Sequence, residues 1–483
     1  MSEAQSVPLV WLVLLPLFWG TVTFILGPGR GGALAIFGLA LQAFCALALA
    51  GDIVDHGSRI HLVGGWTAPL GITLMADGLA AVMLVLTQFV ALLLAISARS
   101  MFSRGGGPWF WPLAGFLIAG MNALFVSGDL FNLYVCLELI SLAAVGLVAA
   151  GGGAEPVAAA LRYLLAGLAG SGAYLLGVAL LYGVFGTVSS SMLAELITPP
   201  VPPAVWLAAA LMLAGLVLKT ALWPLHFWLP AAHGSAPAPV SALLSALVVK
   251  ASFFLILRLS LGPFAGLPGL ALPVALVPAL LGSAAIFWGS WMAIRTVRLK
   301  MLIAYSTVAQ VGYLFLIFPL LGVGGHALEA GVLQIVSHGL AKAAMFIAAG
   351  VLIKVGGSDQ VQGVAGAAGQ LPVTMFAFAL ASVTLMGLPP SGGFLAKWLL
   401  IETALGGGQY WIVVVTLAGG LLASIYTFRI LLLGFHLPTD ADERPRRQVP
   451  VAMEWPALVL AAASVGLGLW AMPLFTLLSG VLR

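Results

Sequence analysis

Long apolar runs dominate the chain and recur along almost its whole length. Each run is long enough for a helix to cross the hydrocarbon core of a bilayer, which takes about 20 residues. Shorter segments with charged, glycine or proline residues separate the runs, as connecting loops would. An even number of spans would place both chain ends on the same side. We expect about fourteen transmembrane helices, at residues 7–27, 32–51, 72–97, 109–127, 129–150, 157–186, 203–222, 238–260, 270–294, 301–321, 327–354, 372–403, 409–434 and 452–480.

The composition supports an integral membrane protein. The 483 residues are 62% hydrophobic and 7% charged, whereas a soluble domain carries about 25% charged residues. The segment 1–6 contains Glu3 but no lysine or arginine, so we expect the first helix to be retained and not cleaved as a signal peptide. The net charge of +4 belongs to loops and gives no indication of nucleic-acid binding. The predicted class is an all-α, polytopic membrane protein.

The sequence lacks the patterns of a cofactor or metal site. No G-x-x-x-x-G-K-[ST] motif is present, and no G-x-G-x-x-G follows a strand-like run. Cys45 and Cys136 are isolated in apolar runs, with no C-x-x-C pair and no Cys/His cluster. We therefore expect no cofactor and no metal, so that an ion gradient or a partner must supply any energy.

The basic residues of the connecting segments favour one orientation, because short cytoplasmic loops are enriched in lysine and arginine. If the N-terminus is outside, twelve basic residues lie at inner loops and helix ends and three at outer ones. We therefore expect both termini on the outer face and the polar segment 436–450 in the cytoplasm, as a candidate partner contact. The twelve are Arg30, Arg99, Arg104, Arg162, Arg295, Arg298, Lys300, Lys354, Arg429, Arg444, Arg446 and Arg447, and the three are Arg59, Arg258 and Arg483.

The remaining four basic residues, Lys219, Lys250, Lys342 and Lys397, all lie inside apolar segments. A charged side chain at the centre of a membrane helix costs about 2.5–3.5 kcal/mol or more, so it is rare without a function. All four are lysine, which can lose its proton when desolvated, whereas arginine stays protonated. A proton carrier needs that property. The alternative is a structural lysine paired with an acid or a carbonyl.

Two further titratable groups fit the same path. Glu138 is the clearest acidic residue within an apolar run, and Lys219 is its natural partner because both lie at comparable membrane depth. His338 and Lys342 stand at i and i+4, which places them on one face of a helix. Histidine titrates near neutrality and suits a relay, although a hydrogen-bonded interior histidine is the alternative.

Two of the apolar segments contain helix-breaking residues beside a lysine. Four prolines and two histidines, His226 and His233, interrupt 218–251, and a Pro-Pro and Gly-Gly pair interrupts 387–398. Broken helices at membrane depth occur where they face protein or a water-filled cavity. Two such breaks about 170–180 residues apart indicate two structural repeats. Asp77 opens the third span and is expected to be a cap or interfacial residue.

Four motifs occur in order and together resemble a known family: DLFNLYVCLELIS, LKTALWPLHFWLPAAHGSAPAPVSALLSALVVKA, SHGLAKAAMF and GLPPSGGFLAKW. They are similar to the antiporter-like subunits of respiratory complex I, membrane-bound hydrogenases and multisubunit (Mrp-type) cation/proton antiporters, over roughly residues 70–430. The resemblance implies fourteen helices with two inverted five-helix repeats, each with a discontinuous helix. The expected division is 1–108 for helices 1–3, 109–260 and 261–434 for the repeats, and 435–483 for a cytoplasmic loop and the last helix.

The resemblance also implies roles for the buried groups. Glu138 and Lys219 look like the coupling pair, and Lys250 looks like the central relay lysine. His338 or Lys342 would continue the relay, and Lys397 would be its terminal residue on the exit side. Some members carry glutamate at that last position, and lysine resembles the D-type subunits of Mrp antiporters and the N-type subunits of complex I.

The function expected from this resemblance is a proton-translocating subunit of an Mrp-type Na⁺/H⁺ antiporter in a bacterial or archaeal inner membrane. The alternative is the same relay in a proton-pumping NADH:quinone oxidoreductase of complex I type or in a membrane-bound hydrogenase. In either case the expected partners are other membrane subunits, protons, lipid and, as a candidate second ion, Na⁺. A stand-alone transporter of an organic solute is a third possibility, and the four buried lysines argue against it.

Overall fold

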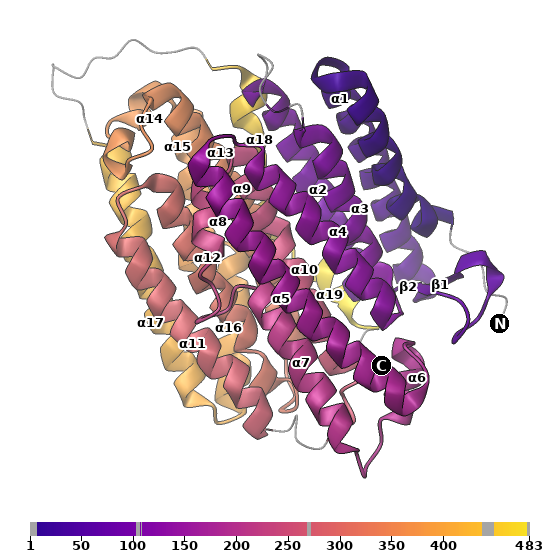
Figure 1. Ribbon diagram of the computed structural model, residues 1–483. Helices are drawn as coiled ribbons and strands as arrows, with labels where there is room; N and C mark the ends of the chain where they lie inside the picture. Colours follow the sequence, from indigo (N-terminus) through magenta and orange to yellow (C-terminus); the bar gives the residue numbers. More distant parts are fainter. Residues whose placement is uncertain (1–6, 103–106, 108, 268–271, 437–448, 481–483) are drawn as a thin grey trace.

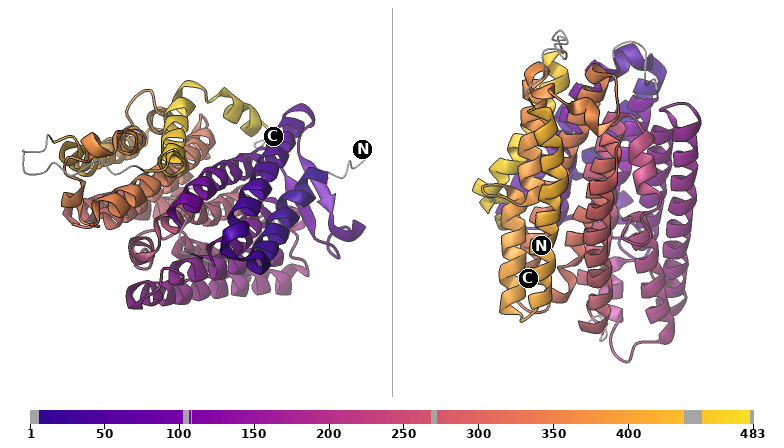
Figure 2. Two further views of the ribbon diagram at one scale, coloured as in Figure 1. Left: turned by 90° about the horizontal axis from the view of Figure 1, so that it is seen from above. Right: turned by 90° about the vertical axis from the view of Figure 1, so that its left-hand side faces the viewer.

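The computed structural model describes residues 7–102, 107, 109–267, 272–436 and 449–480, and within these ranges the chain forms a bundle of long helices (Figure 1). Figure 2 shows from a second side that the long helices run roughly along one direction. The first half contains α1 (Val7–His56), β1 (Arg59–Leu62), β2 (Thr73–Ala76), α2 (Gly78–Met101), α3 (Phe110–Val126), α4 (Leu130–Ala149), α5 (Ala154–Phe185), α6 (Ser190–Leu196), α7 (Pro203–Lys219), α8 (Leu229–Ser235), α9 (Ala238–Leu243) and α10 (Val249–Leu261). A π-turn, Leu244–Val248, joins α9 to α10.

The described part of the second half consists of helices together with two 3₁₀ turns, Phe318–Leu320 and Val361–Val364. The helices are α11 (Leu272–Arg295), α12 (Leu299–Phe315), α13 (Ala327–Gly356), α14 (Ala367–Gln370), α15 (Pro372–Met386), α16 (Gly392–Gly406), α17 (Tyr410–Gly434), α18 (Val451–Leu469) and α19 (Met472–Leu478).

The prediction of an all-α, polytopic membrane protein is confirmed. Eleven helices of the described residues are long and apolar enough to cross a membrane, and three shorter apolar helices, α3, α7 and α15, accompany them. Each predicted run overlaps one of these fourteen helices. The first two runs lie in α1, whose helical geometry is interrupted at Gly27. The number and boundaries of the repeats stay predictions.

Two predicted boundaries are wrong. The run 72–97 begins with strand β2, and α2 starts only at Gly78, where the Asp77 side chain accepts a hydrogen bond from the Ala80 N–H at 3.0 Å. This confirms Asp77 as a helix cap. The run 452–480 is not one helix, because α18 ends at Leu469 and α19 begins at Met472. Pro473 explains the new start, since proline suits the first turn of a helix and disrupts a helix interior.

The predicted breaks are present on two helices. In the first, α7 ends at Lys219 and a run of turns precedes α8, followed by Pro237 before α9. In the second, α15 ends at Met386, and Ser391 caps α16 by accepting from the Phe394 N–H at 3.1 Å. Both breaks leave backbone carbonyls without helical partners in the middle of the bundle.

The core of the bundle lies along α9–α10, α12 and α13, whose residues are almost all buried. Figure 1 places α8, α9 and α10 between the violet early helices and the orange late ones. The helices α1, α5 and α17 bury one side and expose large apolar side chains on the other, which suits contact with lipid or with other membrane helices.

The two ends of the bundle are named here by the arginines they carry. At the Arg258 end, Arg258 donates two hydrogen bonds to Asp77, at 2.5 and 2.7 Å, so α10 is tied to the start of α2. At the Arg298 end, Lys354 donates to the Met101 carbonyl at 3.0 Å, so α13 is tied to the end of α2. Five of the basic residues counted for orientation lie outside the described residues, as does most of the segment 436–450: Arg104, Arg444, Arg446, Arg447 and Arg483.

Candidate functional site

Glu138 and Lys219 lie together, as their sequence depths predicted. Glu138 is on α4 and Lys219 is the last residue of α7, and the Lys219 Nζ atom is 3.9 Å from the Glu138 Oε1 atom. The amine also donates a 2.6 Å hydrogen bond to the hydroxyl of Ser141, one turn beyond Glu138 on α4. Lys219 is 6% exposed. Sequence reasoning missed Ser141, because a serine in an apolar helix has no distinctive signal of its own.

The backbone of α5 approaches α7 closely beside this pair. A Cβ atom on Gly170 would lie 2.8 Å from the Gly215 carbonyl oxygen and 3.1 Å from the Lys219 Cγ atom. A Cβ atom on Gly215 would lie only 2.2 Å from the Gly170 carbonyl oxygen. Glycine at both positions therefore lets the two helices meet, and this contact packs the stem of Lys219.

Lys250 is fully buried on α10, directly after the π-turn. Its amine donates to the Ser245 carbonyl, which belongs to the π-turn. A π-turn changes the hydrogen bonding of the backbone and occurs often at functional positions. The Ser245 hydroxyl is 2.8 Å from the Thr307 hydroxyl, which links the turn to α12. Nothing in the sequence had indicated the π-turn.

His338 and Lys342 occupy one face of α13, as their spacing predicted. The Lys342 amine donates to the Ile303 carbonyl at 2.8 Å and to the Ser306 hydroxyl, both on α12. The His338 ring is 1% exposed, and neither ring nitrogen has a hydrogen-bond partner among the described residues.

Lys397 reaches back to the break before its own helix. Its amine donates to the carbonyls of Leu385 and Met386, at 2.8 and 3.2 Å, which are the last two residues of α15. A positive charge is favourable there, because the end of a helix carries partial negative charge. The amine also lies 4.7 Å from the centre of the Tyr313 ring.

None of the four lysines is exposed to the outside of the bundle. Lys250 and Lys342 are 0% exposed and Lys397 is 7% exposed. Only Lys219 has a carboxylate within 4 Å among the described ion pairs, and the other three amines bind carbonyls or hydroxyls. The structure therefore shows both a buried series of amines and the carbonyl contacts of the structural alternative.

Small cavities adjoin the first and last of the four lysines. One is lined by Lys219 and Ser141, and also by Val248 and Ser252 from the segment that carries Lys250. The other is lined by Lys397, Tyr313 and Gln334. In each cavity, the centre of a water molecule can occupy a volume of about 10 Å³. This is about the volume that is needed to hold one water.

A second buried histidine was noted in the sequence but not placed in the candidate series. His233 lies on α8 and is 0% exposed, and neither ring nitrogen has a hydrogen-bond partner in the described part of the chain. Its ring centre is 5.4 Å from that of Phe346 on α13. Within the same residues, no three His, Cys, Asp or Glu side chains gather as metal ligands would.

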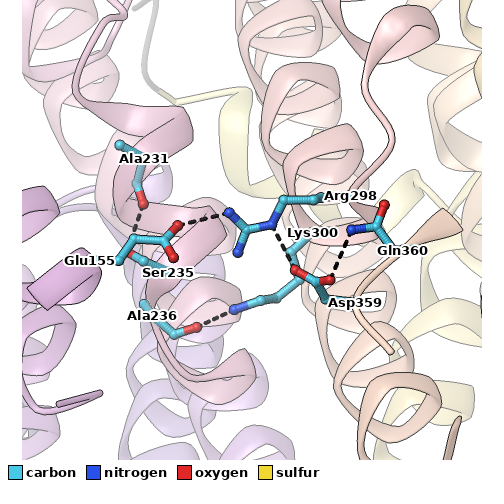
Figure 3. A network of polar contacts seen from close by, with 8 residues as sticks. All are labelled: Glu155, Ala231, Ser235, Ala236, Arg298, Lys300, Asp359 and Gln360. Carbon is cyan, nitrogen blue, oxygen red and sulfur yellow. Dashed lines mark hydrogen bonds and ion pairs between the residues drawn. The ribbon is translucent and has the colours of Figure 1, made fainter. Parts of the chain in front are cut away.

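A network of polar contacts joins several of these elements at the Arg298 end (Figure 3). Arg298 donates to Glu155 at the start of α5, at 2.8 Å, and to Asp359 after α13, at 2.7 Å. The bond to Glu155 raises the pKa of the Arg298 guanidinium above its ordinary value. Lys300 on α12 donates to the carbonyl of Ala236, the residue that follows α8. The network therefore fixes the ends of helices that carry or contact the buried amines.

Residues 127–423 match a family described as "NADH:quinone oxidoreductase/Mrp antiporter, TM". The chain belongs to this family. It is 37% identical to the N-type subunit of the NADH-quinone oxidoreductase of Desulforudis audaxviator, over 95% of each chain. It is 28% identical to the D-type subunit of the Na⁺/H⁺ antiporter of Alkalihalophilus pseudofirmus, over 96% of this chain and 94% of the relative.

A solved structure shares the fold. The chain resembles a chain in the Mrp complex from Dietzia sp. with a TM-score of 0.89 and 27% identity, covering 99% of this chain and 96% of that one. Family membership and the apolar helices together make the chain a multi-pass membrane protein of the antiporter and complex I group. The family resemblance expected from the four motifs is confirmed.

Proposed function

We propose that the chain is a proton-translocating subunit of a multisubunit, Mrp-type cation/proton antiporter. The observation that carries this proposal is the buried series of four lysines, which begins at a pair of opposite charges, Glu138 and Lys219. A relative named as a Na⁺/H⁺ antiporter subunit matches almost the whole chain. The matching Mrp assembly supports the expectation that other membrane subunits are its partners.

A second candidate is a subunit of a proton-pumping NADH:quinone oxidoreductase of complex I type or of a membrane-bound hydrogenase. The observation that favours it is the 37% identity to an N-type oxidoreductase subunit, which exceeds the 28% identity to the D-type antiporter subunit. The relay would be the same, but redox chemistry in other subunits would drive it. The native assembly distinguishes the two candidates: flavin, iron–sulfur or nickel in the purified complex supports the second, and their absence supports the first.

In the proposed mechanism, Glu138 and Lys219 form the coupling pair. The Glu138 carboxylate stabilises the charged form of Lys219, so separating the pair favours release of a proton from the amine. Lys250 is the central relay group, and His338 and Lys342 continue from it. Lys397 is the last group before the exit. Protons move between these groups through bridging waters, and each positive charge disfavours a second one beside it.

The orientation belongs to the proposal as well. With both termini on the outer face, the Arg298 end faces the cytoplasm, in agreement with the excess of basic residues expected there. Protonation of the relay from one side and release to the other then requires partner subunits that respond to the ion gradient. Na⁺ is the candidate counter-ion for the antiport.

The proposal is tested by Lys250→Ala in the assembled complex, reconstituted in vesicles with a fluorescent pH probe. We expect ion-driven proton movement to be abolished while the complex still assembles. Lys354→Ala is the matched control, because Lys354 is an exposed lysine that binds a single backbone carbonyl. Normal transport by Lys250→Ala would overturn the proposed function.

A further inference from the structure

Two glutamines extend the polar contacts between α12 and α13. The Gln334 side-chain amide on α13 donates to the Gln310 Oε1 atom on α12, at 3.1 Å. Two turns further along α13, Lys342 binds Ser306, which is one turn from Gln310 on α12. The two helices are thus joined by two polar contacts in antiparallel register, Gln310 with Gln334 and Ser306 with Lys342.

His338 lies between these two contacts. Gln334, His338 and Lys342 follow one another at intervals of four residues, so they share one face of α13 over about 12 Å. His338 has both ring nitrogens free of hydrogen bonds in the described part of the chain. A buried polar group without a protein partner is the kind of site at which an internal water is held.

From the glutamine pair the hydrogen bonds continue to Lys397. Gln310 donates its amide to the Leu385 carbonyl at 3.0 Å, and the Lys397 amine donates to the same carbonyl at 2.8 Å. One carbonyl can accept both bonds because it has two lone pairs. Gln334 also lines the small cavity beside Lys397. The described hydrogen bonds therefore form a chain from α13 to Lys397: Gln334, Gln310, the Leu385 carbonyl and the amine.

We propose that Gln310 and Gln334 are positioning residues for the last proton transfer, from His338 or Lys342 to Lys397. Gln310 holds the Leu385 carbonyl where the Lys397 amine binds it, and Gln334 orients the water in the adjoining cavity. The proton leaves the imidazolium or ammonium group, passes through water and binds the neutral Lys397 amine. The amides are neither protonated nor altered, since glutamine does not titrate. This inference depends on the proposed function.

The first test replaces each glutamine with leucine in the assembled complex. We expect Gln310→Leu and Gln334→Leu to slow ion-driven proton movement by about tenfold or more, which corresponds to about 1.4 kcal/mol in the barrier. Gln42→Leu is the matched control: Gln42 is a buried glutamine that accepts a 2.9 Å hydrogen bond from Trp19, and both residues lie on α1. It should assemble equally well and transport at the normal rate.

The second test distinguishes positioning from packing by a pH profile. Gln310→Glu places a carboxylate near the Lys397 amine, which favours the charged amine, so the loss of transport at alkaline pH should move to higher pH. A packing role would lower the rate without moving the profile. Gln409→Glu, which adds the same charge beside Trp411, should leave the profile unchanged. If a leucine variant fails to assemble, the Gln310→Glu profile decides the question.

The outcomes separate the two proposals. If Lys250→Ala abolishes transport while both leucine variants behave like Gln42→Leu, the inference about the glutamines is overturned and the proposed function remains. An unmoved pH profile in Gln310→Glu would overturn it as well. If Lys250→Ala transports normally, the proposed function fails, together with the inference that depends on it.

Discussion

The Lys219 amine donates its short hydrogen bond, 2.6 Å, to the hydroxyl of Ser141, whereas the Glu138 carboxylate lies 3.9 Å from the same amine. The amine therefore has a neutral partner in direct contact and a charged partner just beyond hydrogen-bonding distance. A small displacement of α4 or α7 would bring the Glu138 carboxylate into hydrogen-bonding distance of the amine and move the Ser141 hydroxyl away from it. Such an arrangement suits a lysine whose proton affinity changes during a transport cycle.

Substitutions of Glu138 and Ser141 should lower transport by different amounts. Two charges about 4 Å apart interact by about 4 kcal/mol at an effective dielectric constant of about 20, so Glu138→Gln should lower transport by at least about a hundredfold. Ser141→Ala removes one hydrogen bond and should lower it by about two- to tenfold. Proton movement into vesicles measures both. A larger loss in Ser141→Ala than in Glu138→Gln would contradict the assignment of the coupling pair.

The variant Lys397→Arg distinguishes two roles for Lys397, namely proton transfer and structural stabilisation by its charge. Arginine retains the positive charge, can bind the Leu385 carbonyl and can interact with the Tyr313 ring, but it does not release a proton. We expect the complex to assemble and transport to be abolished in vesicle assays. Substantial transport by this variant would show that only the charge of Lys397 is needed.

Asp77→Asn should affect stability more than transport. The variant leaves the half-buried Arg258 without its charged partner, which should lower the free energy of unfolding by at least about 1 kcal/mol in detergent. Asp55→Asn on the exposed end of α1 is the control. Transport per assembled complex should fall less than in Glu138→Gln, and the opposite order would mean that the acidic sites are misassigned.

The same ion pair gives a pH dependence of stability. Burial disfavours the charged form of Asp77, but the hydrogen bonds and the charge of Arg258, together with backbone hydrogen bonds, outweigh it and hold the pKa of Asp77 below its ordinary value of 3.8. A depressed folded-state pKa stabilises the protein above the unfolded value, and this stabilisation is lost as the pH falls through the folded value. The difference in melting temperature between wild type and Asp77→Asn should therefore be full at pH 7 and shrink below about pH 4.

Gly215→Ala should separate α5 from α7. The added methyl group would lie 2.2 Å from the Gly170 carbonyl oxygen, so the helices must move apart and the packing around Lys219 must change. We expect a loss of about 1–3 kcal/mol in stability and reduced transport. Gly172→Ala is the control, because a Cβ atom there meets nothing within 4 Å. Equal melting temperatures for the two variants would contradict this account of the contact.

The sequence predicted those features that depend on local chemistry. The apolar runs predicted the helices, and the prolines and glycines predicted the breaks after Lys219 and before Lys397. Counting residues along two helices was enough to predict that Glu138 meets Lys219. These predictions succeeded because hydropathy, proline geometry and helical rise are properties of the nearby sequence.

The partners of the other lysines could not be predicted in this way. Lys250 and Lys397 bind backbone carbonyls, at Ser245 and Leu385, and every residue has a carbonyl. Ser306 is one of many serines in apolar helices, and only the packing of α12 on α13 brings it to Lys342. Within 452–480, the single residue Pro473 is the local signal for a second helix, and the long apolar run around it masks that signal.

The π-turn before Lys250 sets the direction in which the Lys250 side chain points. Each residue of a regular α-helix turns the chain by about 100°, so an extra residue within one turn rotates everything that follows. Deleting one residue between Leu244 and Val248 would leave all side chains of α10 chemically intact and still swing the amine toward a different neighbour. The direction in which the Lys250 side chain points is thus set by the number of residues in the π-turn. An insertion or deletion there changes this direction without any substitution on α10.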